Sequence, residues 1–380
     1  MADRTRVLWL IKGLGAGGAE QLLVNALPHI DRRRFEYHVA YILPWKNDNV
    51  RHFEAHDVPV HCLGGGSPWD IGVVLRLRRL LRALEIDVLD AHLAYSGVIG
   101  RVAARTAHTP AVIYTEHNLA VQRRLSSFQF LSFMANVATF GWSDMVVTVS
   151  RDGFRDVSRF CRGRAPVRLI YNGIPLDTFD RRRVEPDRSV FSVPDHHKVV
   201  GHMATFTTKK NQADLLRAAK LVLDENPDVT FVLVGKGHLQ PYLEQLAHEL
   251  GIGDRVMFPG FVTNPHEVLA SFDIFALSSL YEGLPTVVIE AMASGVPVVA
   301  TSVGGTAEII NHDHDGVLVP PGDPQALARG MLRLLGDDAL RAEMGKRAEI
   351  SARSKFDIRR RVQEVERAYD EVLGTKAAAR

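Results

Sequence analysis

The chain has 380 residues, 46% of them hydrophobic and 24% charged, which is typical of a soluble globular protein with two domains. No apolar run reaches the roughly 18 residues that span a bilayer. The apolar stretch near the N-terminus is too short for a secretory signal, so a cytoplasmic protein is expected. With Cys62 and Cys161 as its cysteines, the sequence argues against a disulfide framework and against a cysteine-ligated metal site.

Charge is distributed unevenly along the chain. Residues 1–180 contain 22 Lys and Arg against 17 Asp and Glu, whereas residues 181–380 contain 24 against 27. Solvated helix faces are the favoured explanation of the basic half. Attraction to an anionic acceptor or to a membrane surface is the alternative.

Short β-branched segments alternate with amphipathic helical patterns, as in parallel sheets covered on both faces. The strands expected in the first half are Val7–Ile11, Tyr37–Leu43, Val60–Leu63, Val88–Ala91, Ala111–Tyr114, Met145–Val149 and Val167–Ile170. Residues 173–198 lack periodicity and are expected to form a linker. The strands expected after it are Val199–Met203, Thr230–Val234, Val256–Phe258, Ile274–Leu277, Val298–Ala300 and Val317–Val319.

This pattern predicts an α/β protein of two Rossmann-like doubly wound domains that face a cleft. We expect an N-terminal domain over residues 1–178 and a C-terminal domain over 179–355. Residues 356–380 are expected to form a last helix. Open parallel sheets bind ligands beyond the carboxyl ends of their strands, so functional residues should lie in loops that follow strands.

Two loops of this kind carry chemistry suited to phosphate. Residues 13–20 read GLGAGGAE, and glycines before a helix let backbone N–H groups approach an anion. They also match G-x-G-x-x-G, but the second strand is followed by Pro-Trp-Lys and not by the acid that a dinucleotide ribose needs. Lys209 and Lys210 follow the first strand of the second domain, where an anion would relieve their conflict with a helix N-terminus.

A pair of glutamates brackets seven uncharged residues in YEGLPTVVIEAMASG, residues 281–295. Glu282 is expected in a loop and Glu290 in the following helix, with Thr286 as N-cap and Gly295 as the C-terminal stop. Two carboxylates can accept hydrogen bonds from hydroxyl pairs of a ribose and a hexose, and amides of residues 284–286 could bind a diphosphate. A nucleotide sugar has all three parts.

The glutamate pair, together with KKN at 209–211, NGIPLDTF at 172–179, GGTAEII at 304–310 and GVLVPPGDPQAL at 316–327, resembles family 4 of the retaining glycosyltransferases, of the two-Rossmann-domain GT-B type. The likeness covers nearly the whole chain. It implies a retaining hexosyltransferase that moves a sugar from a nucleoside-diphosphate sugar to a glycan, lipid-linked or small-molecule acceptor in bacterial envelope or exopolysaccharide synthesis.

The resemblance also implies the site residues. Glu282 would contact the transferred sugar and His117, in YTEHNL, would lie near it, so both are the expected catalytic residues. Glu290 would bind the ribose. The other expected donor-binding residues are Gly17, Gly18, Thr205, Lys209, Lys210, Gly283, Leu284, Pro285 and Thr286.

One position departs from the family pattern. The family has an arginine five residues before the diphosphate-binding lysine Lys210, and this sequence has Thr205 there. Lys209 could substitute, as a point charge instead of a planar fork. A donor-binding protein without catalysis therefore stays open as an alternative. A nucleotide-sugar epimerase also stays open, because it can use the same paired-domain architecture.

The implied partners are the donor, a UDP-sugar in preference to a GDP-sugar, and a glycan or lipid-linked acceptor. No separate cofactor, metal or nucleic acid is expected, and the family places the C-terminal helix on the first domain. Asp313 and Asp315 form an Asp-x-Asp pattern that is interpreted as an exposed turn. Residues 123–142 are aromatic beside two arginines, so they form either a core helix or a surface that meets a lipid-linked acceptor or the inner face of the membrane.

Overall fold

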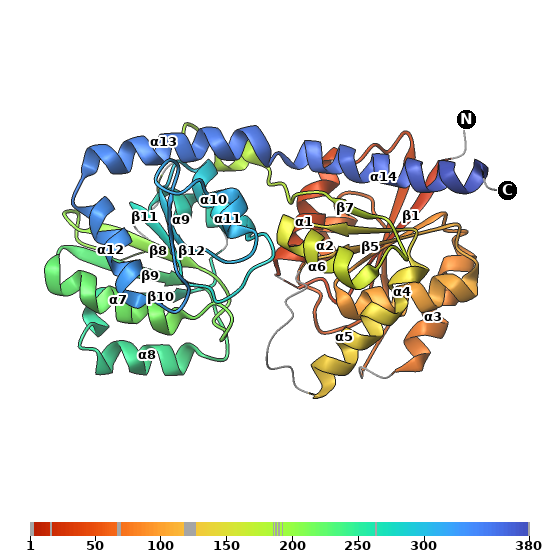
Figure 1. Ribbon diagram of the computed structural model, residues 1–380, viewed down its shortest axis with the longest axis horizontal. Helices are drawn as coiled ribbons and strands as arrows, with labels where there is room; N and C mark the ends of the chain where they lie inside the picture. The colour runs from red at the N-terminus through yellow and green to blue at the C-terminus, as the bar shows by residue number, and fades with distance from the viewer. Residues whose placement is uncertain are drawn as a thin grey trace. The chain divides into compact units, whose positions relative to one another are not determined.

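The structure is a computed structural model that describes residues 4–15, 17–66, 70–117, 127–184, 186, 188, 191, 193–262 and 264–378, with side chains from residue 130 onward in the fourth of these ranges. The chain divides into two compact units (Figure 1). Unit 1 comprises residues 1–173 and 358–380, and unit 2 comprises residues 174–357. The C-terminal helix therefore belongs to the first unit.

Unit 1 is built on a parallel sheet whose described strands follow the order β3-β2-β1-β4-β5-β6-β7. The strands are β1 (Thr5–Ile11), β2 (Phe35–Tyr41), β3 (Val60–Cys62), β4 (Val88–His92), β5 (Ala111–Glu116), β6 (Met145–Thr148) and β7 (Val167–Leu169). The helices are α1 (Gly18–Ala26), α2 (Val50–Glu54), α3 (Ile71–Ala83), α4 (Ala94–Ala107), α5 (Ser127–Thr139), α6 (Arg151–Cys161) and α14 (Ile358–Ala378).

Both faces of this sheet are covered by helices, and alternate residues of each strand pack on opposite faces. On β1, Val7, Trp9 and Ile11 join a core that includes residues of α1 and α14. Leu8 and Leu10 join a second core that includes residues of α3 and α4. Figure 1 shows α14 along one side of the sheet and α3 and α4 along the other.

Unit 2 is also a doubly wound parallel α/β domain, with described strands in the order β10-β9-β8-β11-β12-β13. They are β8 (Lys198–Met203), β9 (Val229–Val234), β10 (Val256–Gly260), β11 (Ile274–Leu277), β12 (Val298–Thr301) and β13 (Val317–Val319). The helices are α7 (Gln212–Glu225), α8 (Gln240–Glu249), α9 (Pro265–Ala270), α10 (Thr286–Ala293), α11 (Thr306–Ile309), α12 (Pro324–Leu335) and α13 (Asp338–Lys355).

The strand order places a topological switch point in each sheet. The chain reverses its direction of winding between β1 and β4 in unit 1 and between β8 and β11 in unit 2. Ligands of doubly wound sheets bind in the crevice at the carboxyl ends of such strand pairs. The two Rossmann-like domains expected from the sequence are therefore confirmed. In each sheet, the carboxyl ends of the strands at the switch point are the expected place for a ligand.

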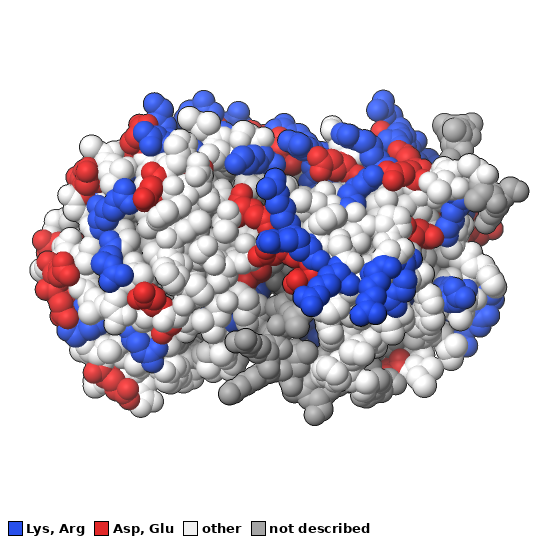
Figure 2. Space-filling model, viewed as in Figure 1, with Lys and Arg blue, Asp and Glu red and all other residues white. Residues whose placement is uncertain are grey.

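The segment that joins β7 to β8 is largely part of unit 2. The sequence predicts a linker over residues 173–198, but its described residues from Ile174 onward belong to unit 2: Ile174 pairs with Asp357, and the 3₁₀ helix Leu176–Phe179 packs on α10. On the drawn face, basic side chains gather over α6, where Arg151, Arg155 and Arg159 are exposed (Figure 2). Among the described residues, no helix is both long and apolar enough to cross a bilayer.

Candidate active site

The switch point of unit 2 brings two lysines and a carboxylate together. Lys209 and Lys210 lie in the loop after β8, and Glu282 lies in the loop after the neighbouring strand β11. The Lys210 Nζ atom is 2.6 Å from Glu282 Oε1, and the Lys209 Nζ atom is 3.2 Å from Glu282 Oε2. The sequence expected all three residues in loops after strands, and the structure places them in one cluster.

Glu282 is held as a carboxylate despite its burial. Only 5% of its side chain is exposed, and burial opposes ionisation, but the charges of Lys210 and Lys209 and hydrogen bonds from Lys210 and Ser279 lower its pKa. Burial in turn lowers the pKa of Lys209, against the attraction of Glu282. A diphosphate bound here would compete with Glu282 for the two ammonium groups, which would release the carboxylate toward hydroxyl donors.

Hydrogen bonds between the two loops fix this arrangement. Ser278 Oγ donates to the carbonyl oxygens of Lys210 and Asn211, at 3.0 Å each, and the Leu280 N–H donates to Lys209 O at 2.9 Å. Both ammonium-bearing residues are therefore tied through their backbone to the loop that carries Glu282. Ordered loops of this kind reduce the reorganisation that binding requires.

A third loop supports the backbone of Glu282. Gly304 and Gly305 follow β12, and the Gly305 N–H donates to Gly283 O at 2.7 Å. A Cβ at Gly304 would lie 2.0 Å from Glu282 O, and Gly304 has a φ of +50°. Glycine is thus needed here both for the close approach and for the backbone conformation. The GGTAEII segment of the sequence contributes to the site through this packing.

Glu290 lies in the second turn of α10, where it is partly exposed. Burial raises its pKa to about 7, and the hydroxyl of Thr286, one turn earlier, opposes this by hydrogen bonding to the carboxylate. The expected N-cap was wrong by one residue: Pro285 is the N-cap and Thr286 is the first helical residue. The hydroxyl of Thr286 therefore serves Glu290 instead of capping the helix.

The other donor-binding residues expected from this segment fall on the same loop. Leu284 and Pro285 are buried, and Gly283 packs on Gly305. Proline has no amide hydrogen, so Pro285 contributes packing and no donor to an anion. Gly295, with a φ of +68°, ends α10 as expected, because its N–H donates to Met292 O.

Thr205 lies in the loop after β8 and is exposed. Its carbonyl oxygen accepts a hydrogen bond from Gln212 Nε2 at 3.2 Å, and the same amide is 3.2 Å from Nε2 of buried His202. His202 Nδ1 in turn donates to Ala276 O, and burial lowers the pKa of His202 to about 4, so its ring stays neutral. This polar chain fixes the loop, while Lys209 beside Lys210 supplies the second positive charge.

In unit 1 the glycine loop also lies at the switch point. Gly17 is the N-cap of α1 and Gly18 is its first residue. A Cβ on Gly17 would lie 2.3 Å from Glu20 Oε2, whereas Gly18 has no described atom within 4 Å of such a Cβ. Glu20 lies beside Gly17 in this loop, and its pKa is raised by burial against the nearby charge of Lys46; the sequence analysis did not single it out. The sequence feature that could have drawn attention to Glu20 is an acidic residue in the first turn of a helix that follows a glycine loop.

His117 follows β5 at the same edge and is 6% exposed. Its Nε2 atom is 3.2 Å from Nδ1 of His92, the last residue of β4. Burial, followed by the charges of His92 and Arg361, lowers the pKa of His117 well below its ordinary value. His117 is therefore a neutral imidazole, which donates a hydrogen bond from one ring nitrogen and accepts one at the other. His92 was missed by the sequence analysis.

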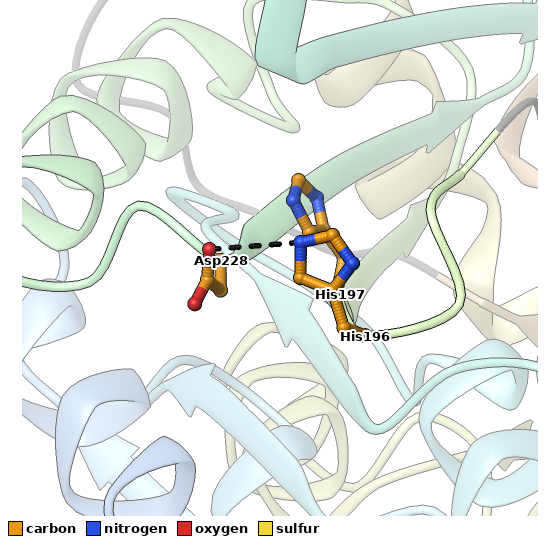
Figure 3. Close-up of side chains that lie close together, drawn as sticks. All are labelled: His196, His197 and Asp228. Atoms are coloured by element: carbon orange, nitrogen blue, oxygen red, sulfur yellow. Dashed lines mark ion pairs between the residues drawn. The ribbon is translucent and has the colours of Figure 1, made fainter.

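His196, His197 and Asp228 lie close together where β8 and β9 begin (Figure 3). His197 Nε2 is 2.9 Å from Arg255 Nη1, and His197 Nδ1 is 2.9 Å from Thr230 Oγ1. Since an arginine only donates hydrogen bonds, it occupies the lone pair that a metal would need. The group lies at the opposite edge of the sheet from Lys210 and Glu282.

Asp313 and Asp315 lie in a turn, as the sequence predicts, but only Asp313 is exposed, so the expectation of an exposed turn was wrong for Asp315. Asp313 has a φ of +62° and pairs with Arg333. Asp315 is buried and accepts hydrogen bonds from the Asn311 N–H and from Ser351 Oγ. Both carboxylates are thus engaged in holding the turn before β13.

The two doubly wound domains, with two lysines and a carboxylate at the switch point of the second, form a site suited to an anionic ligand. The family model Glycosyltransferase Family 4 matches residues 16–178, and the model Glycosyl transferases group 1 matches residues 184–350. The chain belongs to the GT-B glycosyltransferases that these two models describe.

Individual relatives agree with this assignment. The chain is 36% identical over 349 residues, 90% of its length, to the lipopolysaccharide core biosynthesis glycosyltransferase LpsD of Rhizobium meliloti (strain 1021), of which it covers 91%. It is 29% identical over 311 residues, 80% of each chain, to N-acetyl-alpha-D-glucosaminyl L-malate synthase of Bacillus anthracis. The structure of Anabaena Alr3699/HepE in complex with UDP superposes with a TM-score of 0.82 at 25% identity, covering 97% of this chain and 100% of that one.

Proposed function

We propose that this chain is a retaining hexosyltransferase that uses a UDP-sugar donor bound at the carboxyl edge of the unit 2 sheet. The observation that carries the proposal is the cluster of Lys209, Lys210 and Glu282, with Glu290 on the adjoining helix. Two ammonium groups suit a diphosphate, and two carboxylates suit the hydroxyl pairs of the flanking sugars. The UDP complex of the Anabaena relative supports uridine as the base.

Each residue has a proposed role. Lys210 and Lys209 stabilise the negative charge that develops on the leaving diphosphate. Glu290 accepts hydrogen bonds from the ribose hydroxyls, and Glu282 accepts them from the transferred sugar once the lysines bind phosphate. In unit 1, His117 and the backbone of Gly17 and Gly18 are the further residues proposed to take part in transfer.

The acceptor is proposed to be a saccharide of the bacterial cell envelope, bound by unit 1. The match to a lipopolysaccharide core enzyme supports a glycan. A lipid-linked glycan would also suit α5, which exposes Phe130, Leu131 and Met134, beside the basic face of α6. We therefore propose a peripheral contact of unit 1 with the membrane at its cytoplasmic face.

The experiment is a panel of UDP-, GDP- and ADP-sugars tested for thermal stabilisation of the purified chain and for transfer. One UDP-sugar should raise the melting temperature, and Glu290→Ala should remove that shift. Among the catalytic constants, Glu290→Ala should mainly raise KM for the donor, whereas Glu282→Ala should mainly lower kcat.

The rival functions give different outcomes. Interconversion of the donor sugar without an acceptor would indicate an epimerase, and donor binding with neither transfer nor hydrolysis would indicate a non-catalytic binding protein. Equal, small effects of the two glutamate substitutions would contradict the assigned roles.

A further inference from the structure

Three buried polar side chains form a chain at the carboxyl edge of the unit 1 sheet. Asp90 and His92 are 1% exposed and His117 is 6% exposed. His92 Nε2 is 3.5 Å from Asp90 Oδ2, and His92 Nδ1 is 3.2 Å from His117 Nε2. The two imidazole rings lie 5.5 Å apart, between centroids, at 36°. Residues two apart on a strand point to one face, so β4 presents Asp90 and His92 on the same side.

The hydrogen bonds around Asp90 are those expected of an ionised carboxylate. Trp9 Nε1 can only donate, and it donates to the Tyr369 hydroxyl at 3.1 Å. The single proton of that hydroxyl therefore goes to Asp90 Oδ2, at 2.7 Å. Thr115 Oγ1 donates to Asp90 Oδ1 at 3.1 Å. Both carboxylate oxygens are thus acceptors, and the pKa of Asp90 is lowered, because His92 and Tyr369 outweigh the opposing effect of burial.

An ionised Asp90 favours one arrangement of protons on the two histidines. The carboxylate attracts a proton to the nearer nitrogen of His92, Nε2, which lies 3.5 Å from Asp90 Oδ2, although no hydrogen bond joins the two atoms. With its proton there, His92 has a lone pair at Nδ1. His117 Nε2 must then donate the hydrogen bond between the rings. In this arrangement the remaining nitrogen of His117, Nδ1, has no proton and can accept a hydrogen bond.

We propose that Asp90 and His92 are positioning residues for His117, which fix it as the Nε2–H tautomer so that Nδ1 accepts a hydrogen bond from a hydroxyl of the bound saccharide. This inference rests on the proposed function and deepens it. Without the carboxylate, His92 could carry its proton on Nδ1, and His117 would then present an N–H where the substrate also presents a donor. Two donors that face each other leave both hydrogen bonds unmade, which is costly in a buried site.

The C-terminal helix, α14, contributes two residues that act on Asp90 and His117. Tyr369, on α14, provides the 2.7 Å hydrogen bond to Asp90, and Arg361, also on α14, is the further charged group that acts on Asp90 and His117. Tyr369 is completely buried and Arg361 is 5% exposed. A helix more than 240 residues away in sequence therefore helps to set the proton on a residue of the candidate site.

Unit 1 contains a second row of one carboxylate and two histidines, elsewhere on the sheet, which serves as a matched control. On β2, Glu36 Oε1 is 3.4 Å from His38 Nε2, and His38 Nδ1 is 3.4 Å from His61 Nε2. The rings of His38 and His61 lie 5.5 Å apart at 34°. Glu36 has 38% of its side chain exposed, and this chain runs between β2 and β3, away from β4 and β5.

The test is the tautomer of His117, measured in the full-length chain by long-range ¹H–¹⁵N NMR with labelled histidine, and assigned through His117→Gln. The wild-type protein should show the Nε2–H form. Asp90→Asn should convert His117 partly or wholly to the Nδ1–H form and lower kcat/KM for transfer about tenfold to a hundredfold, as expected for one misdirected hydrogen bond to a substrate. Glu36→Gln, the same chemical change in the control chain, should alter neither.

A second pair of variants keeps the test decisive if Asp90→Asn does not fold. His92→Gln retains an oxygen that can accept from His117 and should keep the tautomer and most of the activity, whereas His92→Phe should lose both. An Nδ1–H wild-type His117, or a tautomer that is indifferent to both Asp90 and His92, would overturn the inference. The NMR result is independent of transfer, so a failure of the proposed function would be recognised separately.

Discussion

Glu290 shows how one side chain can make donor binding depend on pH. In the folded chain its pKa is raised from 4.5 to about 7, so its protonated form predominates below pH 7. A raised folded-state pKa also means that the free energy of unfolding decreases as the pH rises from 4.5 through 7. In the role proposed for Glu290, the ribose hydroxyls donate hydrogen bonds to its carboxylate, so the ionised form is the one that binds the nucleotide sugar.

We therefore predict that the affinity for a UDP-sugar is constant above pH 7 and falls by about tenfold per pH unit below it, since one proton must be released. Isothermal calorimetry between pH 5.5 and 8.5 measures this. A UDP-sugar is the suitable ligand because its diphosphate has no group that titrates there, unlike the terminal phosphate of UDP. Glu290→Gln should bind weakly at every pH. The same slope in that variant would assign the titration to another group.

Gly304 packs closely on the backbone of Glu282. We predict that Gly304→Ala lowers the free energy of unfolding by about 2–3 kcal/mol, because the added carbon meets Glu282 O at 2.0 Å and the φ of +50° disfavours a side chain. Denaturant unfolding measures the loss, and donor binding should weaken with it. Gly322→Ala is the control: its φ is +73°, but no described atom lies within 4 Å of the added carbon. It should cost only about 1 kcal/mol and spare binding.

At the scale of single elements, the proposed contact of unit 1 with a membrane depends on α5 and α6. Phe130, Leu131 and Met134 have exposed fractions of 55%, 49% and 46%. An exposed apolar face beside basic residues is typical of helices that bind anionic lipid surfaces. We predict that the chain co-sediments with vesicles containing phosphatidylglycerol and not with neutral vesicles.

The variants of this experiment separate the two helices. Leu131→Ser should reduce binding at all salt concentrations, whereas Arg155→Gln on α6 should mainly reduce binding at low salt, because charge attraction is screened. Leu221→Ser, which changes a 37%-exposed leucine on α7 of unit 2, is the control and should bind normally. Equal binding to neutral vesicles would contradict the charge-assisted contact.

At the scale of the whole molecule, the division into two units predicts which unit binds the nucleotide sugar. Each unit has its own sheet and core, and the lysines, Glu282 and Glu290 all belong to unit 2. We predict that UDP alone slows amide hydrogen exchange in residues 205–212 and 278–290, the loops after β8 and β11 and the start of α10. Lys210→Ala should remove this protection. Protection confined to the loops of unit 1 would refute the placement of the donor.

The candidate site was predicted from the sequence where residue type and loop position were enough. Lys209, Lys210 and Glu282 each follow a strand, and a doubly wound sheet brings such loops to one edge. The supporting residues were not predictable in this way. Nothing in the sequence indicates that Gly304 touches Glu282, or that Tyr369 reaches Asp90, because these contacts join segments that are neighbours only after the strands have paired.

The sequence by itself determined the two parallel sheets, because β-branched segments that alternate with amphipathic helices can bury their apolar faces in few other ways. It also determined the kind of chemistry, since charged residues in loops after strands are placed by the topology alone. The tertiary structure decided the state of each group: the ionised Glu282, Glu290 with a pKa near 7 and the neutral His117. Those states follow from burial and from the distance to charges on other elements, and neither quantity exists until the chain is folded.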